Sequence, residues 1–524
     1  MHARRDPDEF ANPPRRFRTP LLLTAGLAAA GLVATLLVWL PGRLDCGGPG
    51  SGLVREDGEC VGVTDGSHPF LPRNAEDLER DYRAVQELIR KENDRVAGNA
   101  KKSENEKIDA VKIALLLTLT PDHRSPLSPE RILHSMEGAH TAQKRANEGR
   151  IGDEVPQIQL LLANAGSRHT RWSTPVEALK RMTDDPIPLV AVVGPGISTE
   201  DTREAARELA EEGIPVIAST ASADNLFYDE ETAEGPVLPL ARVTGSNTEF
   251  VKALHRYTTD RDDLRTAVLV HDRNATDLHV TSLTAAFSTV FEAELGKNPA
   301  QPFQGTTIGD RAVPALFDSV TRNVCGTEAD MVLFSGRLHD LTTFITKLGE
   351  RTCRARSPLS VLFVDTGPMS QSEEMTDLLG IGDLTLVQAA AVDPRGPTGE
   401  ETGGETPEGF AGFLEGHTKA LAPEKQDAAL DTIRDGYAVI HHDAVMTAVR
   451  AARMAYAEAP TEELQAEGVA NALFLLNSGN TVSGAGGTLS FTEELRGEPG
   501  GRPLPVIETP SGPGHPATYL TPMN

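Results

Sequence analysis

Short apolar segments alternate with amphipathic helical segments along most of the chain, and this alternation is the feature that most restricts the fold. In a first array the expected strands are 111–119, 158–163, 189–193 and 216–218, and the expected helices are 129–148, 176–182 and 200–212. Short, nearly continuous apolar runs are typical of strands buried on both faces, and the intervening helices connect parallel neighbours. The pattern therefore predicts an α/β fold with a doubly wound parallel sheet.

A second array follows the first without any sequence repeat that relates the two. Its expected strands are 266–271, 331–335, 361–365 and 384–391, and its expected helices are 248–257, 280–295 and 341–351. Two arrays predict a bilobal domain over 109–495, with lobe 1 formed by about 109–240 and 385–480 and lobe 2 by about 241–384. Ligands bind beyond the carboxyl ends of strands in open parallel sheets, so we expect a ligand cleft between the lobes.

Other segments surround these arrays. Residues 41–108 are expected to form a juxtamembrane segment with a disulfide loop and a helix over 76–97, without a core of their own. Residues 394–408, rich in Gly, Thr and Glu, are expected to be disordered. Apolar residues at helical spacing predict a helix over 443–458, and the Pro/Gly-rich residues 496–524 are expected to be an extended tail.

An uncharged apolar run, 21–40, follows an arginine-rich stretch near the N-terminus. Twenty helical residues span roughly 30 Å, the thickness of the hydrocarbon layer of a bilayer. The positive-inside rule predicts a cytoplasmic tail over 1–19, a single transmembrane helix over 20–40 and an extracytoplasmic remainder. A cleaved signal peptide is the alternative, although no small-x-small cleavage site follows Leu40. A buried core helix is a third interpretation.

Composition narrows the classes of function. The formal net charge is −26, and a surface so negative repels nucleic acids and anionic lipid headgroups. The chain contains no G-x-G-x-x-G, Walker A or G-x-S-x-G motif, so we expect neither a cofactor nor an enzyme. His441, His442 and Asp443 are adjacent in sequence, but no further ligand is placed near them, so we expect no metal site.

The chain has four cysteines, Cys46, Cys60, Cys325 and Cys353. An even number in an exported protein predicts disulfides. The spacing makes sequential pairing plausible, yet four cysteines allow three pairings and the sequence does not choose among them. Buried free thiols are the alternative, and the lack of a CxxC motif disfavours a metal site.

Residues 190–227, VAVVGPGISTEDTREAARELAEEGIPVIASTASADNLF, resemble the central part of the type I periplasmic binding-protein fold. The closest branch is the leucine/isoleucine/valine-binding type that is associated with ABC transporters. Further segments resemble this family in the same order, namely 240–247, 267–279, 329–350, 359–369, 441–453 and 487–497. The resemblance covers about 110–495. It implies a protein that captures a small polar molecule, such as an amino acid, for an ABC permease.

The resemblance also implies ligand-binding residues in lobe 1. In the family, the turns after the third and fourth strands hold a carboxylate through hydroxyls and backbone N–H groups, with helix N-termini behind them. The matching positions here are Ser198 and Thr199 in the first turn and Thr220, Ala221 and Ser222 in the second. The alternative is that Ser198 merely caps the helix over 200–212 and that Ser222 caps the next turn.

Lobe 2 departs from the family pattern. Its first turn contains Asp272 and Asn274, which we expect to face the ligand, but it has no aromatic ring. Met369 follows the Gly-Pro turn where branched-chain amino acid binders place an acidic residue for the ligand ammonium. Asp272 or Asp365 could substitute, although each is also a natural strand-end turn residue. A second function therefore stays open, namely a tethered sensor or partner-binding surface protein with lost or altered ligand binding.

Overall fold

The computed structural model describes residues 46–48, 51–102, 108–149, 155–228, 235, 237–307, 313–353, 358–369, 373–395, 406–421, 430–460, 463–510 and 518–520. The predicted cytoplasmic tail, the predicted transmembrane helix and most of the stretch 394–408 lie outside these residues. Within the described ranges, no helix combines the length and apolar character needed to cross a membrane.

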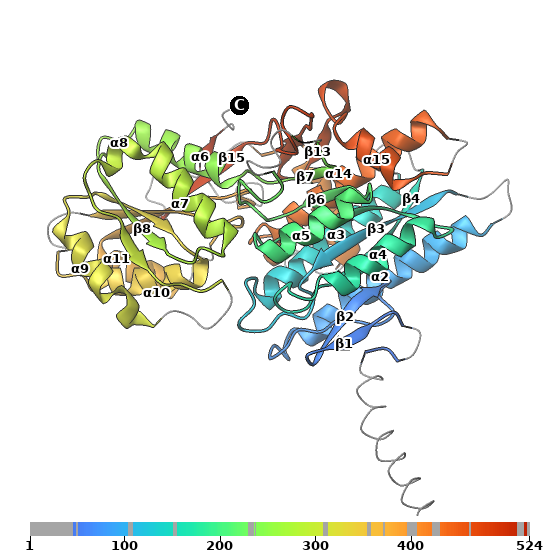
Figure 1. Ribbon diagram of the computed structural model, residues 1–524, viewed down its shortest axis with the longest axis horizontal. Coiled ribbons are helices and arrows are strands. Elements are labelled where there is room, and N and C mark those ends of the chain that lie inside the picture. Colours follow the sequence, from blue (N-terminus) through green and yellow to red (C-terminus); the bar gives the residue numbers. More distant parts are fainter. Residues whose placement is uncertain are drawn as a thin grey trace, which may run out of the picture.

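The chain folds into two lobes, each built around a central sheet (Figure 1). The sheet of lobe 1 has the order β1-β2-β4-β3-β5-β6-β7. Its strands are β1 (Val54–Glu56), β2 (Glu59–Thr64), β3 (Ala110–Leu117), β4 (Gln157–Asn164), β5 (Leu189–Val193), β6 (Val216–Ala218) and β7 (Leu240–Arg242). Neighbours from β4 to β7 run parallel, as the alternation of strands and helices predicts.

Helices cover both faces of this sheet. They are α2 (Glu79–Ala100), α3 (Pro129–Asn147), α4 (Ser173–Arg181), α5 (Glu200–Glu211), α12 (Phe410–Leu421), α14 (Tyr437–Glu458) and α15 (Ala466–Leu473). Alternate residues of β3 point to opposite faces, because side chains in a strand have a period of two. Ile113 and Leu115 join the core beneath α2, α3 and α14, whereas Ala114 and Leu116 join the core beneath α4 and α5.

Lobe 2 has the same plan, with the sheet order β16-β15-β12-β11-β10-β8-β9. Its strands are β8 (Ala267–Asp272), β9 (Gln301–Phe303), β10 (Met331–Ser335), β11 (Leu359–Val364), β12 (Leu384–Ala389), β15 (Leu504–Thr509) and β16 (Thr518–Leu520). Its helices are α6 (Asn247–Thr259), α7 (Leu278–Val290), α8 (Glu292–Leu295), α9 (Asp318–Gly326), α10 (Leu338–Gly349) and α11 (Glu373–Gly382). Helices α6 and α7 cover one face and α9, α10 and α11 the other.

The segment before 109 differs from the prediction, because it is part of lobe 1 rather than a separate juxtamembrane element. Strand β2 pairs antiparallel with β4 at the edge of the sheet. On α2, the side chains of Tyr82, Val85 and Ile89 are buried in the main core. The position of β2, between β1 and β4, is specified by a distant partner, since Asn164 of β4 donates to the carbonyl of Cys60, 104 residues away. Local patterns therefore could not reveal the pairing.

Two predicted boundaries of lobe 2 also change. Strand β12, which the sequence pattern places in lobe 1, pairs parallel with β11 and belongs to lobe 2. Strand β15 lies in the predicted tail and pairs antiparallel with β12. The apolar residues of β15 are bracketed by prolines and glycines, which make the whole region resemble an extended tail. The chain thus crosses between the lobes after β7, after β12 and again before β15.

The helix predicted over 443–458 begins earlier, at Tyr437, so His441 and His442 lie inside it rather than at its start. Both histidines are fully buried. His441 Nε2 lies 2.8 Å from Ser219 Oγ, and His442 Nε2 lies 2.6 Å from Arg145 Nη1. Their partners come from other elements of lobe 1, so the two rings connect α14 to its neighbours. Strands β13 (Val482–Gly484) and β14 (Gly487–Leu489) form a small hairpin after α15.

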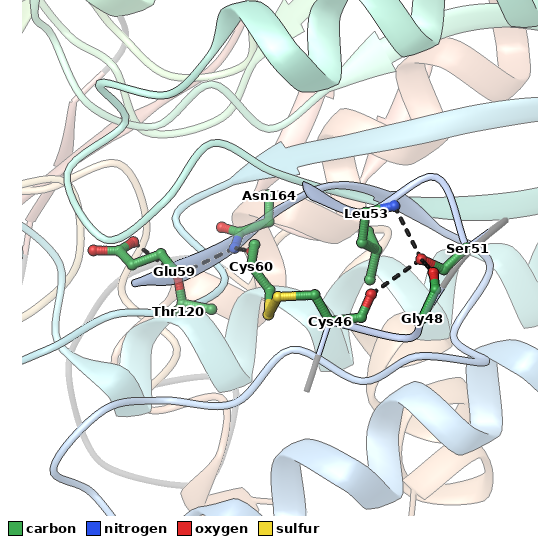
Figure 2. The surroundings of a disulfide bond; sticks show 8 residues. All are labelled: Cys46, Gly48, Ser51, Leu53, Glu59, Cys60, Thr120 and Asn164. Atoms are coloured by element: carbon green, nitrogen blue, oxygen red, sulfur yellow. Dashed lines mark hydrogen bonds between the residues drawn. A yellow bond between two sulfur atoms is a disulfide. The ribbon is translucent and has the colours of Figure 1, made fainter. Parts of the chain in front are cut away.

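Two disulfides follow the sequential pairing. Cys46 is bonded to Cys60 and Cys325 is bonded to Cys353. Figure 2 shows the first of them, with Cys60 in β2; Asn164 donates to the carbonyl of Cys60 and Thr120 donates to the Glu59 carboxylate. The second joins the end of α9 to the loop that follows α10.

Candidate functional site

A cavity of about 310 Å³ lies between the two lobes, and both lobes contribute to its walls. From lobe 1 it is lined by Ser128, Arg131, Gly196, Ser198, Thr220 and Ser222. From lobe 2 it is lined by His279, Arg337, Leu338, His339, Asp365 and Thr366. Most of these residues follow directly on the carboxyl end of a parallel strand.

The topology of each sheet explains the position of this cavity. In lobe 1 the chain passes from β3 to β4 on one side and returns to β5 on the other side of β3. The loops after β3 and β5 therefore diverge and leave a crevice, as at the switch point of other open sheets. Lobe 2 repeats the arrangement at β8 and β10. The two crevices face each other across the cavity.

The lobe 1 wall is braced by hydrogen bonds between its two turns. Ser198 Oγ accepts hydrogen bonds from the N–H groups of Ser222 at 3.0 Å and Ala223 at 3.1 Å. Thr220 Oγ1 donates to the carbonyl of Gly196 at 2.9 Å, and a Cβ added at Gly196 would lie 2.6 Å from that hydroxyl oxygen. The turns approach so closely that only glycine fits at 196.

The capping alternative for Ser198 is wrong. Thr199 is the N-cap of α5, and its side chain accepts a hydrogen bond from the N–H of Thr202 at 3.3 Å. The Ser198 hydroxyl instead satisfies two backbone donors of the second turn. Ser222 caps no helix of the described chain, and its hydroxyl faces lobe 2.

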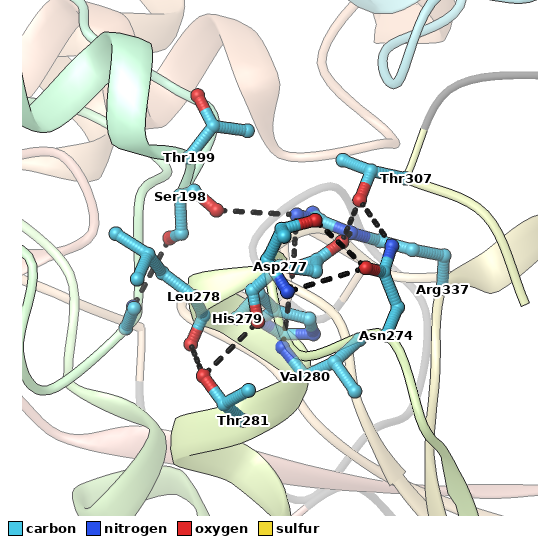
Figure 3. Close-up of polar contacts among 12 residues, drawn as sticks. Ser198, Thr199, Asn274, Asp277, Leu278, His279, Val280, Thr281, Thr307 and Arg337 are labelled. Atoms are coloured by element: carbon cyan, nitrogen blue, oxygen red, sulfur yellow. Dashed lines mark hydrogen bonds and ion pairs between the residues drawn. The ribbon is translucent and has the colours of Figure 1, made fainter.

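The lobe 2 wall is organised around an ion pair between Arg337 and Asp277, shown in Figure 3. Arg337 Nε lies 2.9 Å from Asp277 Oδ2, and Nη2 lies 2.8 Å from Oδ1. Thr307 Oγ1 also donates to this carboxylate, at 2.6 Å. Burial alone would raise the pKa of Asp277, but the charge and hydrogen bonds of Arg337 outweigh it and lower the pKa to about 2. The carboxylate is therefore ionised and fully paired.

Direct contacts already join the two walls. Ser222 Oγ lies 3.1 Å from His279 Nδ1, and Arg337 Nη2 donates to the Ser198 carbonyl at 3.4 Å. Thr199 and Asp277 also form an isolated antiparallel bridge. Burial, reinforced by the nearby guanidinium, lowers the pKa of His279 to about 3. The imidazole is therefore neutral at physiological pH.

The Arg337–Asp277 pair lies within lobe 2, whereas a second ion pair at the cavity joins the two lobes. Arg131, in the first turn of α3, lies with its Nη2 atom 2.7 Å from Asp365 Oδ2, just after β11. Its Nη1 atom donates to the hydroxyl of Tyr437 at 3.3 Å. Thr366 Oγ1 donates to the Thr220 carbonyl at 3.1 Å, so this side is also held by a hydrogen bond between lobes.

The predicted site residues divide into two groups. Ser198, Thr220 and Ser222 line the cavity together. Thr199 caps α5 instead, and Ala221 is buried away from the cavity. These placements leave the first three as the lobe 1 candidates for ligand contact.

In lobe 2 neither predicted residue lines the cavity. Asp272 is 3% exposed, and its Oδ1 atom accepts hydrogen bonds from the N–H groups of Asn274 and Gly305. Burial raises the pKa of Asp272. Asn274 donates to Thr307 at 3.0 Å and so supports the Asp277–Arg337 pair from behind. Asp272 is thus a turn residue at the end of a strand rather than a ligand contact, which was the alternative for this position.

Sequence reasoning did not identify Arg131, His279 or Arg337 as site residues. Each lies in or next to the first turn of a helix that follows a parallel strand. That position could have marked them in the sequence as candidate site residues. Among the described residues, no cluster of three or more His, Cys, Asp or Glu side chains is placed to hold a metal ion.

Solved structures with this arrangement were found for many substrate-binding proteins. A leucine-binding protein from Thermotoga maritima is 16% identical, with a TM-score of 0.51. The match covers 79% of this chain and 99% of that protein. A branched-chain amino acid transporter substrate-binding protein from Streptococcus pneumoniae, in complex with isoleucine, is 15% identical, with a TM-score of 0.53, covering 79% and 100%.

A further neighbour is a solute-binding protein of an ABC transporter from R. palustris, in complex with 4-hydroxybenzoate. It is 14% identical, with a TM-score of 0.52, covering 79% of this chain and 96% of its own. No protein-family model and no curated protein matches the chain. The chain therefore has the type I periplasmic binding fold, and the predicted resemblance is confirmed at the level of the fold.

Proposed function

We propose that this chain is an extracytoplasmic solute-binding protein, anchored in the membrane by residues 20–40, that captures a small polar ligand between its lobes. The observation that carries the proposal is the cavity whose walls come from the switch points of both sheets. A ligand that contacts both walls at once stabilises the closed arrangement of the lobes relative to an open one.

Delivery of the ligand to an ABC permease is part of the same proposal. It is supported by the names of the structural neighbours, which are substrate-binding proteins of ABC transporters. Those names also favour binding over catalysis. The cavity volume of about 310 Å³ is at the lower end of the usual range for small-molecule sites.

One observation favours the alternative of a tethered sensor or partner-binding surface protein. The groups that would hold a ligand carboxylate in lobe 1 already have partners, since Ser198 Oγ binds two backbone donors and Ser222 Oγ contacts His279. A ligand must replace the Ser222–His279 contact or add to it. A protein that has lost its ligand would keep the lobes joined in this way.

A thermal-shift screen of the full-length chain in detergent tests the proposal, with amino acids, amides, organic acids, sugars and nucleosides as probes. A ligand that binds only the native state raises the melting temperature. Replacement of Ser222 by Ala should weaken the binding of any hit by about 1 kcal/mol or more, because a hydrogen bond is lost. The matched control is Ser288→Ala, since Ser288 lies on the exposed side of α7 and bonds only within its own helix.

The outcomes separate the two functions. A hit that Ser222→Ala weakens and Ser288→Ala leaves unchanged supports solute binding at this site. If no probe raises the melting temperature, the tethered alternative is favoured. The anchor is tested separately by fractionation, where full-length chain is expected with the membranes. A mature N-terminus near residue 46 would show that the apolar segment is removed.

A further inference from the structure

Charge in the cavity is distributed unevenly, and this bears on the class of ligand. Two carboxylates line it, Asp122 and Asp365. Asp365 is engaged on both oxygens, because Oδ2 pairs with Arg131 at 2.7 Å and Oδ1 accepts from the N–H of Thr366 at 3.1 Å. Asp122 lies half-buried in the loop after β3, where its Oδ1 accepts from the N–H of Arg124 at 2.8 Å.

Arg337 presents a donor to the same cavity. Its Nε and Nη2 atoms are held by Asp277, whose carboxylate is 0% exposed and so does not face the ligand. Its Nη1 group has no hydrogen-bonding partner among the described residues. The guanidinium is thus held rigidly from behind by Asp277, while one edge remains open to a ligand that can accept hydrogen bonds.

The N-termini of four helices also lie near the cavity. Helices α3, α5, α7 and α10 all begin beside the cavity, because each follows the carboxyl end of a parallel strand. The N-terminus of a helix attracts negative charge. Arg337 is the N-cap residue of α10 but makes no side-chain cap hydrogen bond, and Leu338 in the first turn lines the cavity.

His279 completes this wall. Its side chain is 8% exposed and lines the cavity, and its Nδ1 atom contacts Ser222. Among the described residues its Nε2 atom has no hydrogen-bonding partner, so this second polar atom, on a residue that is 8% exposed, is available to a ligand. A neutral imidazole can donate one hydrogen bond to a carboxylate, but it cannot balance the charge of an ammonium group.

From these observations we infer that the cavity binds a small organic acid that carries a carboxylate and no ammonium group, with the carboxylate on the open edge of Arg337. The inference rests on the proposed function and specifies its ligand class. An amino acid would also bring an ammonium group. Of the two carboxylates that line the cavity, Asp365 is already paired with Arg131, which leaves Asp122 alone to balance that charge. Burial of an ammonium group without a partner is unfavourable.

Matched probes on one carbon skeleton test the inference by calorimetric titration of the full-length chain. 4-Methylpentanoate carries the carboxylate alone, L-leucine adds the ammonium group, and 4-methylpentanamide removes the charge. 4-Hydroxybenzoate and its amide provide a second pair of another shape. At least one acid is expected to bind about tenfold or more tightly than its amide, and 4-methylpentanoate to bind more tightly than L-leucine.

Variants locate the carboxylate. Arg337→Gln should weaken acid binding about tenfold or more, and the double change Arg337→Gln/Asp277→Asn should do the same without leaving a buried charge unpaired. Lys347→Gln is the control for the change in net charge, since Lys347 lies at the surface of α10 and pairs with Asp318 and Glu350. Asp122→Asn should strengthen acid binding, because it removes a negative charge that lines the cavity.

The outcomes distinguish this inference from the proposed function. Tighter binding of L-leucine, with its loss in Asp122→Asn, would overturn the inference and leave solute binding standing. Binding of an amide, a sugar or a nucleoside while the acids do not bind would have the same consequence. If none of the titrated probes binds while the thermal-shift screen gives another hit, the inference alone fails. If the screen gives no hit either, solute binding fails with it. Acid binding that survives in both Arg337 variants would also overturn the proposed position of the carboxylate.

Discussion

The two lobes share one topology, but their cores are packed in different ways. Lobe 1 is built on close helix contacts between small residues, and a Cβ added at Gly138 of α3 would lie 2.0 Å from the carbonyl oxygen of Ala438 in α14. Lobe 2 contains a cluster of phenylalanine rings from β9, α10, β10 and the segment before α9, with ring centroids 5.0 to 5.6 Å apart. The same order of strands therefore does not require the same kind of core.

The lobes differ in polarity as well. Lobe 1 buries His140, His169, His417 and His441, and burial lowers the pKa of each of them to about 3 or 4. Among the described residues of lobe 2, the buried histidine is His279, at the boundary with lobe 1. We conclude that lobe 1 should be sensitive to added volume and to acid, whereas lobe 2 should be sensitive to removed volume.

The largest expected effect is on the ring cluster of lobe 2. Phe334 is 1% exposed and stacks on Phe303 and Phe344. Phe334→Ala should lower the free energy of unfolding of this lobe by about 3–5 kcal/mol, because it leaves a cavity as well as losing apolar burial. Urea unfolding monitored by hydrogen exchange of lobe 2 peptides measures it. Val313→Ala, at a side chain 67% exposed, is the control. A cost below about 1 kcal/mol would show that the rings are loosely packed.

Added volume should damage lobe 1 by a somewhat smaller amount. Gly138→Ala is expected to destabilise it by about 3 kcal/mol, because the new methyl group meets the backbone of α14 rather than a flexible side chain. Gly98→Ala is a matched change in α2, where nothing lies within 4 Å of the added Cβ. The free energy of unfolding of this control variant should rise by about 0.5–1 kcal/mol, because alanine has the better helix propensity. Equal effects of the two changes would contradict the close contact between α3 and α14.

The smallest of the three effects concerns acid. His417 is fully buried between Thr141 and Thr432, and burial lowers its pKa to about 3, below the usual value in an unfolded chain of about 6.5. Between those values the unfolded state binds more protons, so the stability contributed by neutral His417 is lost as the pH falls. Between pH 7 and pH 5 the free energy of unfolding should therefore fall by about 2 kcal/mol less in the His417→Gln variant than in the unmodified chain.

Urea unfolding at several pH values measures this difference. Glu137 acts in the opposite direction, because burial raises its pKa to about 7 and its protonation favours the folded state as the pH falls. The comparison between variant and unmodified chain cancels that contribution. Identical pH dependences for the two proteins would mean that His417 does not govern the acid response of lobe 1.

Most of the fold could be predicted from local pattern. The parallel strands and the helices between them lie close to their expected positions, because side-chain periodicity is set by neighbours in sequence. The errors lie at the edges of both sheets. Strands β2 and β15 pair antiparallel with strands far away in the chain, and the sequence near them carries no mark of those partners.

The candidate site could be predicted only in part. Ser198, Thr220 and Ser222 are identifiable because they follow buried strands and resemble a known pattern. Arg131 is not, since its partner Asp365 is 234 residues away. Local pattern favours Asp272 over Asp277, although only the second pairs with Arg337.

The sequence by itself determined that two sheet-and-helix arrays would form and that their turns would carry hydroxyl groups. Tertiary structure decided which charges face the cavity and which are turned away from it. The physical reason is that a carboxylate loses its influence on a ligand when a guanidinium from another element covers it. Asp277 and Arg337 are separated by 60 residues, and they meet only after β8 and β10 have become neighbours in the sheet.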